Sequence, residues 1–217
     1  MRKRVIVTAA LAALLVVGGL YASNMGFKLN YPLVGPSGSG TGNNMLALPY
    51  NQQTNLIDAE DLILDIDASP GGPVVGSVTA FLTDNTTLSY TGFSGTNFAL
   101  TPGAGYRVSV SADVNYIIVG SHDPSLVINL LGPASGGGTG TNMWAYPYHS
   151  TQTLAGGLIN EIDAAYGGSV VSAVTTFLTD NTTLSYTGFS GTNFSLTPGE
   201  AYQIAVSDDV SFVPSHY

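Results

Sequence analysis

Aromatic side chains stand at alternate positions in residues 142–148, which read NMWAYPY. Alternate residues of an extended strand share one face, so Trp144, Tyr146 and Tyr148 would form a row of rings. Such a row could bind a glycan, because aromatic faces stack on sugar rings while their tips stay polar. The matching earlier stretch, residues 44–50, carries leucines at two of these three positions, which is typical of a hydrophobic core. Ligand binding and core packing both remain open for this row.

A second candidate site is the acidic stretch 58–67, which reads DAEDLILDID. The carboxylates of Asp58, Asp61 and Asp65 could offer oxygen ligands to Ca²⁺. However, the stretch lacks the glycine and the ligand spacing of a calcium loop, and a later copy keeps only Glu161 and Asp163. Apolar residues at helical spacing predict instead a short helix, capped by Thr54, with the acidic residues on its solvated side. The sequence thus predicts no cofactor, with calcium as the alternative.

Catalytic chemistry has little support. There is no cysteine, which excludes thiol nucleophiles, thiolate metal sites and disulfides. His122 and His216 occupy matching Ser-His positions, whereas His149 replaces Asn51 of the other copy. Serines are plentiful, but no G-x-S-x-G motif marks one of them as a nucleophile. The chain is therefore predicted not to be an enzyme.

The organisation of the chain follows from an internal repeat. Residues 81–98, FLTDNTTLSYTGFSGTNF, return letter for letter at 177–194. Repeats of this kind indicate duplicated structural units. Each unit has about 97 residues, enough to enclose its own hydrophobic core. We predict two domains, residues 23–122 and 123–217.

Each unit is predicted to be mainly β, with about six strands and one short helix. Apolar and polar residues alternate from Tyr106 to Val110, which indicates a strand with one buried face. Asp-Asn and Thr-Pro-Gly sequences predict tight turns between strands. Gly156 and Gly157 fall within the second helix and predict that it is the shorter one. The expected fold class is two tandem β-sandwiches or partly open barrels.

The first 22 residues have the pattern of a secretory signal peptide. Arg2, Lys3 and Arg4 precede an apolar run, and cleavage is expected near Ala22; a retained N-terminal anchor is the alternative. Removing this segment leaves two basic and fourteen acidic residues, a net charge of −12. Such an acidic chain repels nucleic acids and anionic lipids, so neither is expected as a partner, and no membrane contact is expected beyond the N-terminal segment.

The order of these motifs resembles a tandem module of secreted and cell-surface proteins of bacteria and archaea. In that group a G-W-N-L-x-S-L-P type motif precedes an L-x-P-G-x-G-Y-x-V type motif. The matching segments here are residues 42–50 with 100–110, and 140–148 with 196–206. The chain departs from the pattern at Leu46, where an aromatic is usual, and at Arg107 and Gln203, which replace a second aromatic. The resemblance implies an extracellular accessory or structural module and brings no catalytic residues.

Together these features predict a secreted or cell-surface structural protein that assembles with copies of itself. The strand expected from Phe27 to Val34 precedes a flexible loop, so it could complete the sheet of a neighbouring copy. The alternative is an adhesive module that binds surface glycans. Asn85, Asn181 and Asn193 lie in N-x-S/T sequences and are candidate glycosylation sites.

Overall fold

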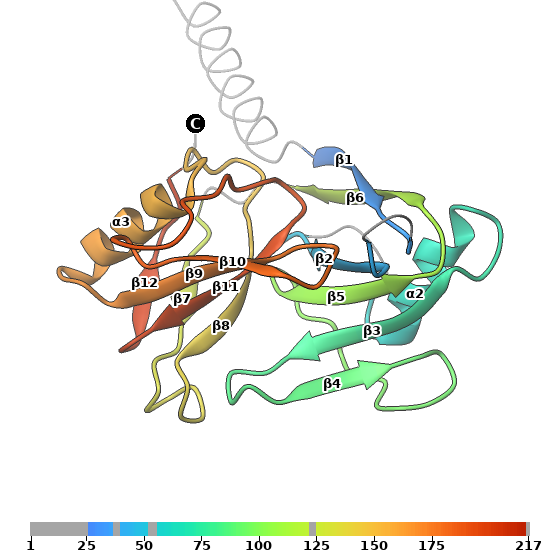
Figure 1. The fold of residues 1–217 in the computed structure, drawn as a ribbon, viewed down its shortest axis with the longest axis horizontal. Helices are drawn as coiled ribbons and strands as arrows, with labels where there is room; N and C mark the ends of the chain where they lie inside the picture. Colours follow the sequence, from blue (N-terminus) through green and yellow to red (C-terminus); the bar gives the residue numbers. More distant parts are fainter. Residues whose placement is uncertain (1–25, 37–39, 52–55, 122–124, 216–217) are drawn as a thin grey trace, which may run out of the picture.

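The computed structural model describes residues 26–36, 40–51, 56–121 and 125–215 (Figure 1). The predicted N-terminal segment, Thr54, His122, His216 and the domain boundary near residue 122 lie outside the described residues. Within the described ranges, no helix combines the length and the apolar character needed to cross a membrane.

Residues 26–121, here called module 1, contain six strands and one helix. Four strands form an antiparallel sheet in the order β2-β5-β3-β4, and β1 pairs with β6 in a separate two-stranded sheet. The elements are β1 (Gly26–Leu33), β2 (Asn43–Ala47), α2 (Ala59–Ala68), β3 (Val75–Phe81), β4 (Thr87–Tyr90), β5 (Gly105–Val110) and β6 (Val114–Ser121).

Residues 125–215, here called module 2, repeat this topology. The order of the four-stranded sheet is β8-β11-β9-β10, and β7 pairs with β12. The elements are β7 (Ile128–Leu130), β8 (Thr141–Ala145), α3 (Ala155–Tyr166), β9 (Val171–Phe177), β10 (Thr183–Tyr186), β11 (Ala201–Val206) and β12 (Val210–Phe212). The predicted fold class is thus confirmed: the protein is mainly β and duplicated, and its sheets remain open rather than closing into barrels (Figure 1).

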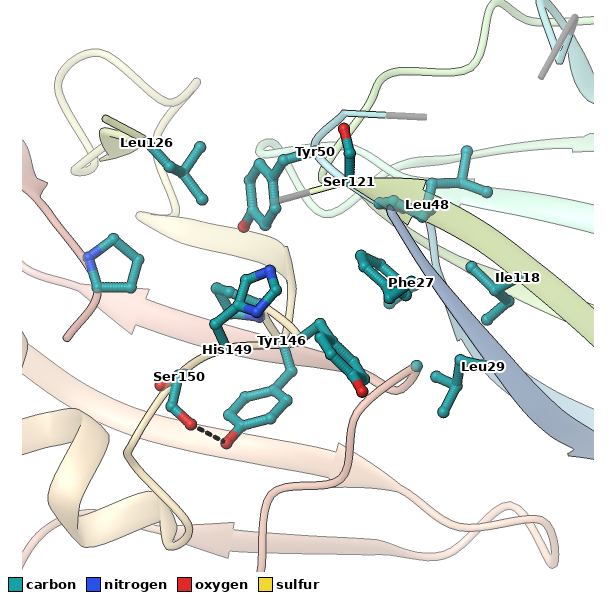
Figure 2. Close-up of a pocket in the computed structure, with 16 residues that line it drawn as sticks. Phe27, Leu29, Leu48, Tyr50, Ile118, Ser121, Leu126, Tyr146, His149 and Ser150 are labelled. Atoms are coloured by element: carbon teal, nitrogen blue, oxygen red, sulfur yellow. Dashed lines mark hydrogen bonds between the residues drawn. The ribbon is translucent and has the colours of Figure 1, made fainter. Parts of the chain in front are cut away.

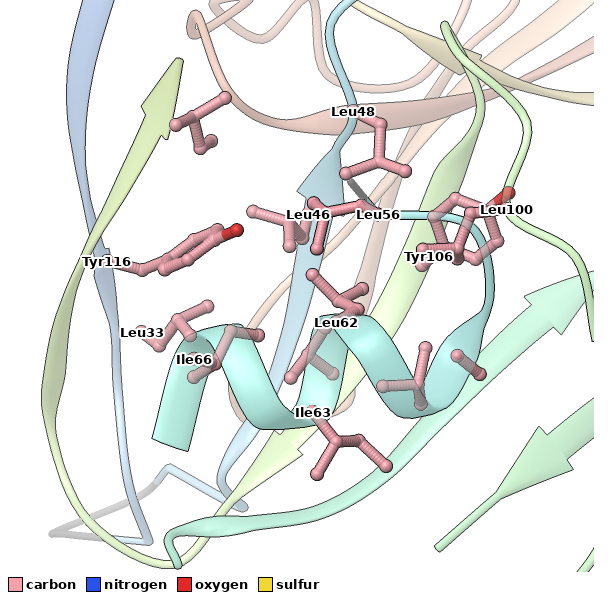
Figure 3. Packing of buried hydrophobic residues seen from close by; sticks show 14 of the residues in the cluster. Leu33, Leu46, Leu48, Leu56, Leu62, Ile63, Ile66, Leu100, Tyr106 and Tyr116 are labelled. Carbon is pink, nitrogen blue, oxygen red and sulfur yellow. The ribbon is translucent and has the colours of Figure 1, made fainter. Parts of the chain in front are cut away.

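The core of module 1 lies between its sheets and the inner face of α2 (Figure 3). Ala59, Leu62, Ile63 and Ile66 of α2 are buried, as the helical spacing requires. Asp58 is the N-cap and forms a capping box with Asp61, which satisfies backbone donors at the start of the helix. The cap is therefore Asp58, whereas the sequence pattern suggested Thr54.

The second helix is longer than the first, with 12 residues against 10, so the prediction that it is shorter was wrong. Gly156 and Gly157 lie in its first turn, where the backbone N–H groups have no partner within the helix. There the N–H of Gly156 donates to Asn193 Oδ1 at 2.8 Å, and a Cβ at Gly157 would lie 2.3 Å from Gln152 Oε1. A left-handed Gly167 (φ 84°) ends the helix. The two glycines thus fit close contacts at the helix start and do not shorten it.

The two modules pack against each other through equivalent surfaces. The Ala47 N–H donates to Gly199 O at 2.8 Å, and in the reciprocal contact the Ala145 N–H donates to Gly103 O at 3.1 Å. A small cluster of Met45, Ala47, Ala145 and Ala201 is buried between the modules. Equivalent surfaces that meet in this way have the geometry of a twofold dimer, here within one chain.

Two pairs of equivalent residues meet along this pseudo-twofold axis. The rings of Phe81 and Phe177 stack at 5.8 Å, and a Cβ on Gly105 would lie 2.2 Å from the Cβ of Ala201. In the described residues the two four-stranded sheets nevertheless stay separate, with an isolated bridge between Leu46 and Glu200. Each module keeps its own core.

Candidate functional site

Each module presents one phenylalanine at the tip of a tight loop. Phe93 and Phe189 occupy the same place in the identical repeat, and the side chain of each is 99% exposed. Isolated apolar residues on a surface are ordinary, but here the same aromatic ring is fully exposed at the same place in both copies. These phenylalanine loops, residues 91–97 and 187–193, are the first candidate site.

The loops hold their shape through their own hydrogen bonds. In the first, the Thr91 N–H donates to Ser94 O at 3.0 Å and the Tyr90 hydroxyl donates to Gly92 O at 3.1 Å. Gly95 adopts a φ of 91°, and a Cβ there would lie 2.1 Å from Ser89 O, so only glycine fits. The second loop repeats each contact with closely similar distances. The loops therefore fix the rings in an exposed position.

The second candidate is an apolar cleft at the junction of the modules (Figure 2). It has an empty volume of 640 Å³ that includes its open mouth, and residues of both modules line it. Phe27 of β1 stacks on Tyr148 of module 2 at 4.4 Å, and His149 meets both rings edge-on. Figure 2 shows His149 between Tyr50 and Ser150. A concave, mostly apolar pocket with a few polar groups is the usual form of a small-molecule site.

Tyr50 ties this cleft to the module interface. Its hydroxyl donates to Ala145 O at 2.9 Å, and burial raises its pKa well above the ordinary value. A Cβ at Gly103 would lie 2.2 Å from the Tyr50 ring, so the glycine allows the ring to lie against the turn. A tyrosine that stays protonated and donates to a fixed carbonyl serves to join the modules rather than to transfer protons.

The aromatic row does not form a platform. Trp144 is 2% exposed and Tyr146 is 6% exposed, both within the core of module 2, so neither ring has an open face on which a sugar could stack. Tyr148 is 39% exposed, but Phe27 covers one face of its ring. The predicted row of three rings is therefore corrected: Trp144 is core, whereas Tyr146 and Tyr148 both line the cleft, and ligand binding by these two tyrosines stays a prediction.

Trp144 is in the core because the two modules fill the same space differently. Module 2 has Trp144 and Ile128 where module 1 has Leu46 and Tyr31. The larger residue on the four-stranded sheet is offset in part by the smaller one on the facing two-stranded sheet, which limits the change in core volume. No described residue accepts a hydrogen bond from the buried Trp144 Nε1, an arrangement that typically costs about 1–3 kcal/mol.

The acidic residues of α2 have structural roles. Asp58 and Asp61 cap the helix, and Asp65 accepts a hydrogen bond from the Tyr116 hydroxyl at 2.6 Å. Among the described residues, no group of three or more histidine, aspartate or glutamate side chains is arranged to hold a metal ion. The carboxylates proposed for Ca²⁺ are engaged in protein contacts instead.

The three glycosylation candidates are exposed but differ in their contacts. Asn85 and Asn181 adopt left-handed φ angles of 65° and 67° in their turns. Asn181 Oδ1 accepts from Asn43 Nδ2 at 2.9 Å, and Asn193 Oδ1 accepts from the Gly156 N–H. Glycosylation at these sites stays a prediction.

One half-buried carboxylate, that of Glu200, lies at the interface. Burial raises the pKa of Glu200, while a hydrogen bond from the Tyr202 hydroxyl at 2.8 Å partly offsets this effect. Burial, with a smaller contribution from the Glu200 charge, also raises the pKa of Tyr31 in module 1. Glu200 therefore couples the electrostatics of the two modules.

Sequence reasoning missed the phenylalanine loops. The available signal was an aromatic residue between glycines, T-G-F-S-G-T, inside the stretch that is identical in both copies. No protein-family model, curated protein or solved structure matches this chain.

Proposed function

We propose that the protein is a secreted, non-enzymatic structural protein of the cell surface or extracellular matrix that assembles with its own kind through the phenylalanine loops. The observation that supports this most is the 99% exposure of Phe93 and Phe189 in two identical, hydrogen-bonded loops. Burying one such ring contributes about 1.5–3 kcal/mol. One contact of this size is weak, but two on one chain make it bivalent, and bivalent contacts add their effects through avidity.

The rest of the molecule supports a structural role. The groups whose pKa is raised by burial or partial burial, Glu200 and several tyrosines, donate or accept hydrogen bonds within the fold. The resemblance to modules of secreted and surface proteins, and the acidic composition, point to the same class of function. The export itself rests on the N-terminal pattern of residues 1–22.

The predicted strand exchange is a less direct route to assembly. β1 pairs with β6 of its own chain along its whole length, and Tyr31 and Leu33 are buried in the core of module 1. An exchanged strand would have to leave this core and enter the same position in a neighbour. The phenylalanine loops need no such rearrangement, so we favour them.

The test is to replace both rings with serine, Phe93→Ser and Phe189→Ser, singly and together. Sedimentation velocity and electron microscopy should show assemblies of the parent chain, weaker assembly of each single variant and monomers of the double variant. The matched control is Leu64→Gln, because Leu64 is 61% exposed on the outer face of α2. The proposal fails if the parent chain stays monomeric at all concentrations, or if the double variant assembles as the parent does.

A further inference from the structure

A hollow of a different character lies on another side of the module interface. Its empty volume is 570 Å³ including its open mouth, and polar and apolar side chains line it. Asn43 and Arg107, on β2 and β5, come from module 1; Phe177, Asn181 and Thr183, from the β9–β10 hairpin, come from module 2. We call it the Arg107 hollow.

Arg107 is one of only two basic residues beyond the first 22 residues of this acidic chain. Its Cζ lies 5.4 Å from the centre of the Phe81 ring, which holds the guanidinium by a cation–π contact. Phe81 in turn stacks on Phe177 at the pseudo-twofold axis. No carboxylate of the described residues lies within 4.0 Å of the guanidinium. The N–H groups of the Arg107 guanidinium are thus held in position, and no ion pair occupies them.

The opposite wall of the hollow is fixed to module 1. The Thr41 N–H donates to Thr179 O at 2.8 Å, and Asn43 Nδ2 donates to Asn181 Oδ1 at 2.9 Å. This bond uses the amino group of Asn43 and the oxygen of Asn181. Asn43 Oδ1 can therefore still accept a hydrogen bond from a ligand, and Asn181 Nδ2 can still donate one. The hollow therefore combines the Arg107 cation, an amide acceptor and an amide donor, the Thr183 hydroxyl and the aromatic ring of Phe177.

We propose that the Arg107 hollow binds a sugar that carries a carboxylate, such as a hexuronic acid. A guanidinium binds a carboxylate through two parallel hydrogen bonds, while amide and hydroxyl groups suit the sugar hydroxyls. The apolar face of Phe177 suits the C–H face of the ring. Residues 23–217 carry a net charge of −12, which repels long polyanions, so recognition comes from these short-range contacts with a single acidic sugar.

The duplication supplies an internal control. Gln203 occupies the position on β11 that Arg107 occupies on β5, in the same strand environment. Glutamine is thus already accommodated at this place in the fold. The variant Arg107→Gln is expected to keep the thermal stability of the parent while removing the cation.

The experiment is isothermal titration of the purified chain with glucuronic acid and, as the neutral match, glucose. We expect the parent to bind one glucuronate, and glucose to bind at least about tenfold more weakly. Arg107→Gln should bind the two sugars equally weakly, and Asn181→Ala, on the opposite wall, should also weaken glucuronate binding. The proposal is overturned if the parent does not bind glucuronate at millimolar concentration, or if folded Arg107→Gln binds it as the parent does.

Discussion

Replacing Gly105 with alanine tests the packing of the two modules most directly. Gly105 and Ala201 are equivalent residues that face each other across the pseudo-twofold axis. The added Cβ would lie 2.2 Å from the Cβ of Ala201, whereas ordinary contacts begin near 3.4 Å. Both atoms are attached directly to strand backbones, so no rotamer change relieves the overlap. The modules would have to separate by more than about 1 Å, which loosens the tight packing at their contact.

Overpacking of this kind typically costs about 1–3 kcal/mol. The reciprocal hydrogen bonds of Ala47 and Ala145 lie beside the contact and would lengthen with it. We therefore expect Gly105→Ala to lower the free energy of unfolding by about 2 kcal/mol, a decrease of roughly 4–8 °C in Tm for a chain of this size. Urea unfolding followed by the fluorescence of Trp144, the single tryptophan, measures the effect in the core of module 2.

Two further variants separate this effect from the general cost of changing a glycine. Gly76→Ala, in β3, adds a Cβ 3.6 Å from Ser109 Oγ and should leave stability nearly unchanged. The double variant Gly105→Ala with Ala201→Gly should recover stability, because the nearest atoms to the new Cβ are then 3.5 Å away, at the Cα of residue 201 and Met143 Cε. The reasoning is refuted if Gly105→Ala is as stable as the parent, or if the double variant is no more stable than the single one.

Two other substitutions test single contacts. Tyr116→Phe removes the 2.6 Å hydrogen bond to Asp65 and should lower the free energy of unfolding by about 1 kcal/mol in urea titrations; an unchanged midpoint would contradict this. Glu200→Gln tests the half-buried carboxylate at the interface. Partial burial raises the pKa of Glu200 above the ordinary 4.5, so the neutral form favours the fold, and stability is lost as pH rises through the raised pKa. The variant should therefore be more stable than the parent at neutral pH and equal to it below about pH 4, and a Tm difference that does not vary with pH would exclude this account.

The parts of the fold that local sequence determines were predictable. Residues 101–103 and 197–199 (Thr-Pro-Gly) predicted tight turns, and Gly103 and Gly199 do adopt positive φ angles of 76° and 91°. The identity of residues 81–98 and 177–194 predicted two copies of one unit, and the strand orders are indeed the same. The turns depend on a few neighbouring residues, and the repeat is found by comparing the sequence with itself. Neither prediction requires knowledge of contacts between distant segments.

The site was much less predictable, because its features depend on contacts between distant segments. Alternation places Trp144 and Tyr146 on one side of a strand, but it does not say which side is buried. That depends on Ile128 and Phe212, which leave room for the larger rings on the facing sheet. For Phe93 the glycines on both sides indicate a loop, but they do not say whether the ring packs on the core or faces solvent.

The contact between Gly105 and Ala201 also shows what joining the modules in one chain permits. In a dimer of identical modules, both residues at this place would be the same. Two alanines would collide, as the 2.2 Å separation shows, and two glycines would leave the space of one methyl group unfilled. One glycine and one alanine fill it, and only two different copies can supply that pair. The same freedom places an arginine at position 107 and a glutamine at position 203, so this chain has one cation beside the axis where a dimer of identical modules would have two or none.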